Sequence, residues 1–537
     1  MKKLATTIGL LACFAIAFSQ TIFTIQGKVV DESGQPISYA NVYIKGSLNG
    51  VSTTSDGNFS LTTAQSDTIS LIVTFIGHQV FKLREKAKNM NYLTISLKEE
   101  TKTIEEVLVY AGNYQLKSSS TINKAKAVDL VSTAGSEGDL YKAISMLPGT
   151  QVSDRDGRLL VRGGSNRETQ TYIDDMHVLS PYTAAFGEVG SRSRYSPFLF
   201  DGINFSLGGY LPEYSQGLSA ILPLYTRNEV TTAKYGIDIM NVSLGTSASI
   251  PYKNTSASYN INYTDLSLYN TVFFPSEKSK WEKPYKDFGL QNQFRFTLGE
   301  NTFLKTYLGY SKTRFVLLTQ NPFDDLIRNL DYDENNFYLN STLQKKFEDG
   351  TKFFLGAAYS INHQEIENAQ TISDFYSTKE SEIHLKTKAE KRFSNFYKLS
   401  GGAELFFKNY QFNYSDTTVF ETDFDQHIDG AFVSNDFNLM KNLYINISSR
   451  VEYTSLSEKW QLLPRAAIGY KWNDFTVSGV VGKYQQNTDN EILIYNKNLL
   501  PENNIQTLIG LYYENETKII RLEAYHKKYN KLPLKTD

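Results

Sequence analysis

The sequence predicts a mainly β protein that ends in an antiparallel transmembrane β-barrel. Composition is the first reason, because the 537-residue chain has 36 Tyr, 33 Phe and 34 Gly but only 13 Pro. The second is that no stretch beyond residue 20 offers the ~18 uncharged apolar residues of a spanning helix. The third is a period of two from residue 231 onward, where apolar and polar residues alternate as they do along strands with two different faces.

Residues 1–19 have the pattern of a signal peptide. Two lysines precede the apolar run Ile8–Phe18, and Ala17 and Ser19 place small residues before a cleavage site. The chain's one cysteine, Cys13, lies in this segment, so the mature chain would form neither disulfides nor cysteine-ligated metal sites. A loose lipobox ending at Cys13 leaves a lipoprotein as the alternative, although the apolar run continues past it.

Residues 20–100 are expected to form a small β-sandwich, since short alternating runs are separated by Gly, Pro, Asp and Asn. The expected strands are Ile25–Val30, Ala40–Ile44, Asn58–Leu61, Ser70–Phe75 and Tyr92–Leu97. The motifs Gly27–Asp31, Thr54–Phe59 and Phe75–His78 resemble the carboxypeptidase regulatory-like domain. That resemblance implies a non-catalytic module.

Residues 101–112 form a separate segment in which two carboxylates precede the apolar strip Val107–Val109. Taken alone, this segment is a linker or the last strand of the sandwich. The alternative is a recognition strand, whose backbone hydrogen bonds would bind a partner by β-addition.

Residues 113–230 mix loops with one helix. Apolar residues at i, i+3, i+4 and i+7 predict a helix over Gly138–Leu147, and Pro148 and Gly149 end it. The motifs that follow are Val161-Arg162-Gly163-Gly164, Ile173-Asp174-Asp175 and Glu213–Ser219.

These motifs, in this order, closely resemble the plug of TonB-dependent outer-membrane receptors. Asp175 and Ser215 stand where that family usually has glycine, which puts only two local turns in doubt. Arg162 is expected to brace the plug rather than to bind a ligand.

Residues 231–537 are expected to be the barrel, with an apolar face in lipid and a wet lumen. Leu443, Ile445 and Ile447, for example, alternate with Tyr444 and Asn446. Short turns alternate with longer polar stretches, and Asn321–Glu334 and Glu365–Ser381 are expected to be loops of the second kind.

We count about fourteen alternating runs in this region, whereas barrels of the resembling class have about 22 strands. The sequence therefore predicts an incomplete, C-terminally truncated barrel, either a truncated gene or a sequence fragment.

No catalytic motif is visible, and we expect neither an enzyme nor a cofactor or metal site. Asp331, Asp333 and Asn335 mimic the start of a calcium loop, but Asn336 replaces its glycine. Without the signal peptide, 53 basic residues (55 − 2) would face 57 acidic ones. That balance argues against nucleic acid as a partner.

The resemblance implies an outer-membrane receptor that binds a scarce extracellular nutrient and imports it to the periplasm when TonB moves the plug. The first expected ligand is a siderophore-type molecule, followed by a glycan or a peptide. The expected partners are TonB of the TonB-ExbB-ExbD complex, outer-membrane lipid, the nutrient and a surface lipoprotein. The regulatory-like domain would lie in the periplasm. The alternative is a surface β-sandwich adhesin without transport.

By the same resemblance, the segment before the plug maps onto the TonB box. Its residues are Thr103, Ile104, Glu105, Glu106, Val107, Leu108 and Val109.

Ligand contacts are expected on two plug loops that resemble the apical loops of ferrichrome-type receptors. The expected residues are Arg155, His177, Tyr182, Phe186, Arg192, Arg194 and Tyr195. This basic and aromatic set suits anionic or ring-bearing ligands. The alternative is that these side chains brace the plug against the barrel wall.

Overall fold

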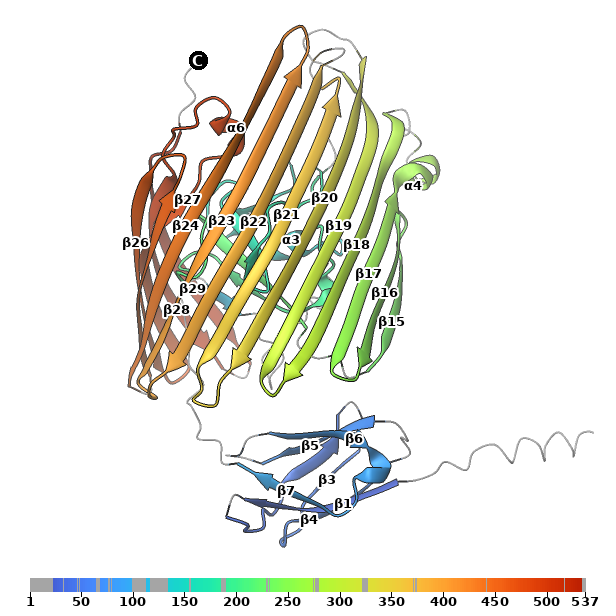
Figure 1. Cartoon of the computed structure of the whole chain (residues 1–537), viewed down its shortest axis with the longest axis vertical. Helices are drawn as coiled ribbons and strands as arrows, with labels where there is room; N and C mark the ends of the chain where they lie inside the picture. The colour runs from blue at the N-terminus through green and yellow to red at the C-terminus, as the bar shows by residue number, and fades with distance from the viewer. Residues whose placement is uncertain are drawn as a thin grey trace, which may run out of the picture. The chain divides into compact units, whose positions relative to one another are not determined.

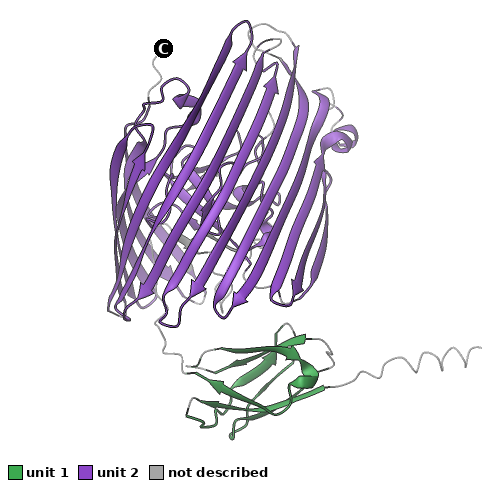
Figure 2. Ribbon diagram, in the orientation of Figure 1, with its two compact units in different colours: residues 1–106 green, residues 107–537 purple. Residues whose placement is uncertain are grey.

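The structure is a computed structural model, and the chain divides into two compact units, residues 1–106 and 107–537 (Figure 2). The described residues are 23–31, 33–45, 47, 49–63, 68–75, 78, 80–98, 113–115, 134–153, 156–184, 190–227, 230, 232–273, 275, 280–320, 327–369, 371, 374–440, 442–515 and 517–533.

The first unit is a β-sandwich, as the sequence predicts. One sheet has the order β4-β1-β7 and the other the order β3-β2-β5-β6. Alternate side chains of both sheets, such as Val29, Val42, Leu71 and Ile95, fill a common core. The elements are β1 (Phe23–Asp31), β2 (Asn41–Ile44), β3 (Gly50–Ser52), β4 (Asn58–Thr63), β5 (Thr68–Thr74), β6 (Phe81–Lys86), η1 (Ala87–Asn89) and β7 (Leu93–Leu97).

The second unit contains one antiparallel sheet of 15 strands whose spatial order, β15 to β29, follows the sequence (Figure 1). The sequence predicted about fourteen strands. The strands are β15 (Lys234–Ile239), β16 (Ser243–Tyr252), β17 (Thr255–Asp265), β18 (Trp281–Gly299), β19 (Thr302–Gln320), β20 (Ile327–Lys346), β21 (Lys352–Glu367), β22 (Phe375–Arg392), β23 (Tyr397–Ser415), β24 (Val419–Met440), β25 (Leu443–Thr454), β26 (Lys459–Trp472), β27 (Phe475–Gln486), β28 (Glu502–Glu514) and β29 (Ile519–Asn530). Two short helices, α4 (Leu266–Val272) and α6 (Asn490–Leu493), lie in the connections.

The two faces of this sheet differ in polarity, and β23 shows the pattern clearly. Leu405 and Phe407 are exposed on one face, while Glu404 and Phe406 are buried on the other. The outward apolar band on β23 runs from Leu399 to Phe407, eight steps of about 3.3 Å along the strand. A tilted strand of that length crosses the hydrocarbon core of a bilayer.

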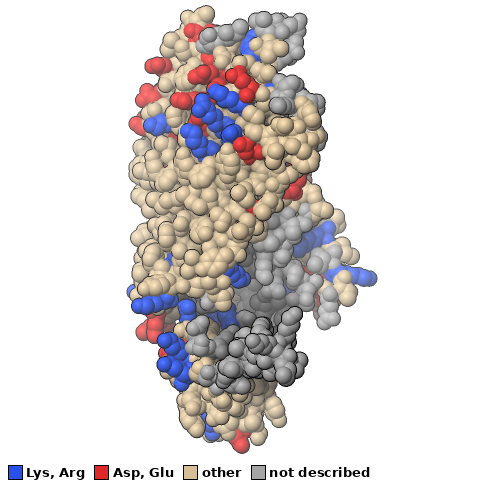
Figure 3. Space-filling view, turned by 90° about the vertical axis from the view of Figure 1, so that its right-hand side faces the viewer, with Lys and Arg blue, Asp and Glu red and all other residues tan. Residues whose placement is uncertain are grey.

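Several strands continue past this apolar band. Parts of the two segments that were expected to be loops, Asn321–Glu334 and Glu365–Ser381, are therefore strands instead. The structure describes Ile327–Glu334 as part of β20, and Glu365–Glu367 and Phe375–Ser381 as parts of β21 and β22. Outward-facing charges pair across the extended strands, with Lys312 3.7 Å from Asp333 and Arg314 3.8 Å from Asp331. Figure 3 shows charged side chains gathered toward one end of the unit, with a wide uncharged band next to them.

The plug packs inside the curve of the large sheet (Figure 1). Its sheet has the order β12-β11-β14-β13-β8, and a separate hairpin pairs β9 with β10. Barrel residues Tyr307, Tyr338 and Phe354 share one hydrophobic core with plug residues such as Ile173 and Leu222. The plug elements are β8 (Asn113–Gln115), α3 (Leu140–Ile144), β9 (Thr150–Val152), β10 (Leu159–Val161), β11 (Thr169–Ile173), β12 (Met176–His177), η2 (Pro197–Leu199), β13 (Phe200–Ser206) and β14 (Ala220–Thr226).

Helix α3 lies within the predicted helix Gly138–Leu147 but is shorter. Asp139 caps it by accepting hydrogen bonds from the backbone N–H groups of Tyr141 and Lys142. Leu147 still packs against the plug core from the turn that follows the helix. No helix among the described residues has the length and hydropathy to span a membrane.

The apolar band predicts how strand β23 tolerates charge. Leu405→Arg would place a cation at the height of the hydrocarbon core and should destabilise the protein by about 2–4 kcal/mol. Asn409→Arg, on the same strand and face but beyond the band, should be nearly neutral. Denaturant unfolding in lipid vesicles measures both, and equal losses would show that the band does not face lipid.

Candidate functional site

The plug hairpin β11–β12 carries several residues that contact the barrel wall. Its two-residue turn consists of Asp174 and Asp175, with φ values of 48° and 66°. Both values suit a type I′ turn, in which aspartate is tolerated beside the more usual glycine. Asp174 accepts hydrogen bonds from the Thr226 backbone N–H at 3.0 Å and from Lys305 Nζ at 3.4 Å. The hairpin is therefore tied both to the plug sheet and to β19.

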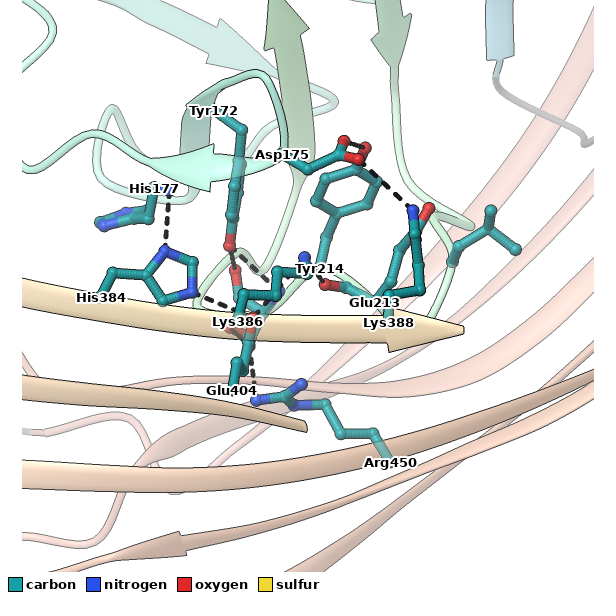
Figure 4. Close-up of polar contacts among 12 residues, drawn as sticks. Tyr172, Asp175, His177, Glu213, Tyr214, His384, Lys386, Lys388, Glu404 and Arg450 are labelled. Carbon is teal, nitrogen blue, oxygen red and sulfur yellow. Dashed lines mark hydrogen bonds and ion pairs between the residues drawn. The ribbon is translucent and has the colours of Figure 1, made fainter. Parts of the chain in front are cut away.

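Asp175 links the hairpin to β22 (Figure 4). Its carboxylate accepts hydrogen bonds from the hydroxyl groups of Tyr214 at 2.6 Å and Tyr225 at 3.1 Å, and lies 3.3 Å from Lys388 Nζ. Burial opposes ionisation, but the ammonium groups of Lys388 and Lys386 outweigh it, so the pKa of the Asp175 carboxyl lies well below its usual range. Lys388 also pairs with Glu213 of the plug.

His177, at the other end of the hairpin, makes three polar contacts although it is only 3% exposed. Its Nδ1 lies 2.7 Å from Glu382 Oε1 and its Nε2 lies 3.0 Å from Gln170 Oε1. Its backbone N–H donates to His384 Nδ1 at 3.0 Å. Because Nδ1 of His384 accepts this bond, a neutral His384 carries its proton on Nε2, which faces Glu404 at 3.3 Å.

Glu404 is the centre of the buried charges on the barrel wall (Figure 4). It lies 2.7 Å from Arg450 and 3.6 Å from Lys386, and it accepts a hydrogen bond from Ser215 Oγ of the plug at 2.6 Å. Ser215 is one of the two positions where the resembling family has glycine, and here its hydroxyl joins the plug to β23.

A polar cavity of about 210 Å³ lies between the plug and the barrel on the side of the longer connections. It is smaller than most small-molecule pockets, so it suits one part of a polar ligand. Its lining is rich in amide side chains and contains charges of both signs. The lining residues are Arg158, Asn166, Arg167, Thr169, Gln170, His177, Leu179, Pro181, Tyr182, Gln216, Glu380, Lys408, Gln426, Gln486, Asn487, Thr488, Asp489 and Asn490.

Two of the predicted ligand residues, His177 and Tyr182, line this cavity. Tyr182 is held against the Tyr141 ring with centroids 4.2 Å apart, and the Arg158 guanidinium lies 5.6 Å from its ring centroid. Arg155, Phe186 and the whole segment Thr103–Val109 lie outside the described residues.

Three other predicted residues lie away from the cavity lining. Arg192 donates to the backbone oxygen of Glu137 at 2.7 Å. Arg194 is buried and lies 2.6 Å from Glu334 Oε1 of the barrel. Tyr195 packs against the rings of Tyr307 and Tyr338. Arg194 and Tyr195 thus have the contacts that the bracing alternative describes, as does Arg162, which pairs with Glu523 of β29.

Sequence reasoning missed the barrel side of the site. Glu380, Lys408 and Gln426 come from three different barrel strands and meet only in the folded lumen, where Gln216 of the plug joins them. A pattern that could have indicated it is the row of ionisable residues at every second position from Glu380 to Glu390. Within the described part of the chain, no three His, Cys, Asp or Glu side chains are grouped so as to hold a metal ion.

Comparisons with known families match both units. Residues 25–109 match the CarboxypepD_reg-like domain, and residues 166–535 match the model described as TonB dependent receptor-like, beta-barrel.

Two curated relatives match parts of the chain. The TonB-dependent receptor SusC of Bacteroides thetaiotaomicron is 33% identical over 158 residues, which is 28% of this chain and 15% of that protein. The TonB-dependent receptor P39 of Formosa agariphila is 26% identical over 179 residues, 30% of this chain and 17% of that protein. The matches thus span about a sixth of the relatives' own lengths.

Solved structures share the fold at low identity. The ferric enterobactin receptor PfeA of Pseudomonas aeruginosa aligns over 80% of this chain and 72% of its own, with a TM-score of 0.61 and 13% identity. The siderophore receptor PirA of Acinetobacter baumannii aligns over 75% of this chain and 70% of its own, with the same TM-score and identity.

The buried carboxylate of Asp175 predicts a pH-dependent contribution to stability. Asp175→Asn should lower the free energy of unfolding by about 1–3 kcal/mol at neutral pH, because Lys388 loses one of its two carboxylates. Since the folded-state pKa is depressed, this contribution is present above the unfolded value of about 3.9 and is lost as the pH falls below it.

Denaturant unfolding at pH 7 and at pH 3 measures this difference. The gap between wild type and Asp175→Asn should shrink at the lower pH. Asp349→Asn is the matched control, because Asp349 pairs with Lys391 at 2.7 Å in an exposed turn where such pairs contribute little. A gap that widens on acidification would contradict the assignment.

Proposed function

The chain belongs to the family of TonB-dependent receptors, which are outer-membrane β-barrels, and on this basis we propose that it imports a small polar nutrient. The observation that carries the proposal is the polar cavity of about 210 Å³ between plug and barrel on the side of the longer connections. In barrels of this kind the longer connections are extracellular and the short turns are periplasmic. The ligand therefore enters the cavity from outside, and the plug separates it from the periplasm.

Release to the periplasm requires work on the plug, which we assign to TonB. The segment Thr103–Val109 precedes the plug, and its backbone would provide the hydrogen bonds by which β-addition binds a partner. TonB pairs with this segment and pulls it, and the regulatory-like domain, which precedes it in the sequence, is periplasmic.

A siderophore-type ligand is the first candidate substrate. Arg158, Arg167 and Lys408 outnumber the two carboxylates of the lining, although Arg167 pairs with Asp489 and Lys408 with Glu382. The Tyr182 ring lies in the same lining. Cations and aromatic rings suit an anionic, ring-bearing ligand.

A glycan is the second candidate, favoured by the amide groups of the lining. Gln170, Gln216, Gln426 and Gln486 each carry both a donor and an acceptor, which matches hydroxyl groups well. The hydroxyl groups of a glycan would replace protein partners that Gln170, Gln216 and Gln486 already have. Growth and uptake of a clean deletion strain and its complemented form, across ferric siderophores and glycans, test transport and separate the two classes. Wild-type growth of the deletion strain on all of them would leave an adhesin as the better description.

Neutralising two cations of the cavity tests whether the ligand is an anionic siderophore or a neutral glycan. The double variant Arg158→Gln, Arg167→Gln should weaken binding of an anionic ligand by roughly 100- to 10,000-fold, because each of the two charge-assisted hydrogen bonds contributes about 1.5–3 kcal/mol. A neutral glycan should lose far less. Arg192→Gln is the matched control, since Arg192 lies outside the cavity lining. An equal loss of affinity in Arg192→Gln would show that the cavity is not the binding site.

A proline in the segment Thr103–Val109, on which TonB is proposed to pull, should abolish import without abolishing ligand binding. Val107→Pro removes a backbone donor that β-addition needs, so uptake should fall to the level of a strain without TonB while surface binding persists. Val107→Ala keeps the donor and serves as the control. Undiminished uptake by the proline variant at normal expression would refute the assignment.

A further inference from the structure

Strand β22 carries an uninterrupted row of ionisable side chains on its inward face. Alternate residues share one face of a strand, so these side chains follow one another along the lumen wall. They are Glu380, Glu382, His384, Lys386, Lys388 and Glu390. Three carboxylates, two ammonium groups and an imidazole give the row no strong net charge. Such a surface binds neither an anionic nor a cationic ligand tightly. Weak binding is what a translocation path requires, because the ligand must be able to leave each site.

A cavity lies at each end of this row. Glu380 lines the loop-side cavity. Lys388 and Glu390 line a second cavity of about 330 Å³ at the end of the short turns, together with Asp175 of the plug and Lys346 of β20. The residues between the two cavities are Glu382 to Lys386, four steps of about 3.3 Å, so the closed stretch is only about 13 Å long.

The plug closes this stretch with polar contacts. His177 meets Glu382 and His384, Lys386 donates to the backbone oxygen of Glu213, and Asp175 meets Lys388. Water or the polar groups of a ligand can replace each of these contacts, because ion pairs and hydrogen bonds exchange with little net change in free energy.

At other strands the plug adds aromatic contacts with the wall, which water replaces poorly, beside polar ones such as Arg194 with Glu334. Near β19 and β20, Tyr195 packs edge-on against Tyr307 and Tyr338. Opening such a contact would expose apolar surface at about 25 cal/mol per Å².

Near β26 and β27, the Arg465 guanidinium lies 4.6 Å from the Tyr210 ring centroid and 4.5 Å from the Tyr484 ring centroid. Polar groups also join the plug to β29, as between Lys527 Nζ and Ser219 Oγ at 2.6 Å. The row on β22, however, has a cavity at both of its ends.

We propose that the translocation path follows the inward face of β22, and that withdrawal of hairpin β11–β12 joins the two cavities. The proposal rests on the transport function proposed above. The passing ligand exchanges its own hydrogen bonds for those that His177 of the hairpin makes with Glu382 and His384, and for the one that Glu213 of the plug accepts from Lys386. The rest of the plug keeps its aromatic contacts with the wall.

Thiol labelling tests the path without knowledge of the ligand. Ser360 lies on β21 opposite Glu382 and is 4% exposed, so Ser360→Cys places a nearly isosteric reporter beside the row. Ser478, on the inner face of β27, is 2% exposed and gives the matched control Ser478→Cys. Ala358→Cys, opposite His384, is a second reporter in case the first does not assemble. All three variants carry Cys13→Ser.

The probe is a membrane-impermeant biotin maleimide added to intact cells, either energised or treated with a protonophore. Energised cells should label Ser360→Cys by roughly tenfold more than treated cells, because the reaction rate follows the fraction of time that a buried thiol is open. Ser478→Cys should stay unlabelled in both. Equal labelling of both positions, labelling of Ser478→Cys alone or no labelling in energised cells would each overturn the path. Nutrient uptake by the wild type, measured in the same cells, tests the proposed function separately.

Discussion

A strand that crosses a bilayer has one face in lipid, and this constraint decides where the polar groups of the second unit can lie. On β23 the apolar band of Leu399–Phe407 faces outward, so Glu404 must face inward. The same holds along β22, where Ile383 and Leu385 alternate with Glu382, His384 and Lys386. The lumen wall is therefore polar, and any domain that fills the lumen must present polar groups to it.

The plug meets that requirement with a small number of buried charges and hydroxyls. An isolated buried carboxylate is very costly, and Glu404 is stable because Arg450, Lys386, His384 and Ser215 surround it. Well-packed apolar residues could give comparable stability. What polar contacts add is reversibility, since they can be exchanged for water when the plug moves.

Several residues, among them His177 and Gln216, belong both to the cavity lining and to the contacts that hold the plug. His177 faces Gln170 in the cavity through Nε2 and holds Glu382 through Nδ1. Gln216, a non-glycine residue with φ of 59°, donates to Glu452 at 3.0 Å and accepts from the Asn487 backbone N–H at 3.0 Å. A ligand that binds either side chain competes with the contact that this side chain makes with the barrel. Under the proposed function, ligand binding in the cavity and the position of the plug are therefore energetically coupled.

The sequence by itself determined the classes of structure. The period of two in β25, the apolar spacing of α3, and the motifs around Arg162 and Asp175 are local patterns, which neighbouring residues establish without distant contacts. Local patterns do not determine how far β20 and β21 extend, because Arg314 and Asp331 pair only across two strands. Nor could they pair Arg194 with Glu334 or place Gln216 and Lys408 around one cavity. Tertiary structure alone decided the cavity and the contacts along β22, because they depend on which strands of the lumen wall the plug hairpin faces.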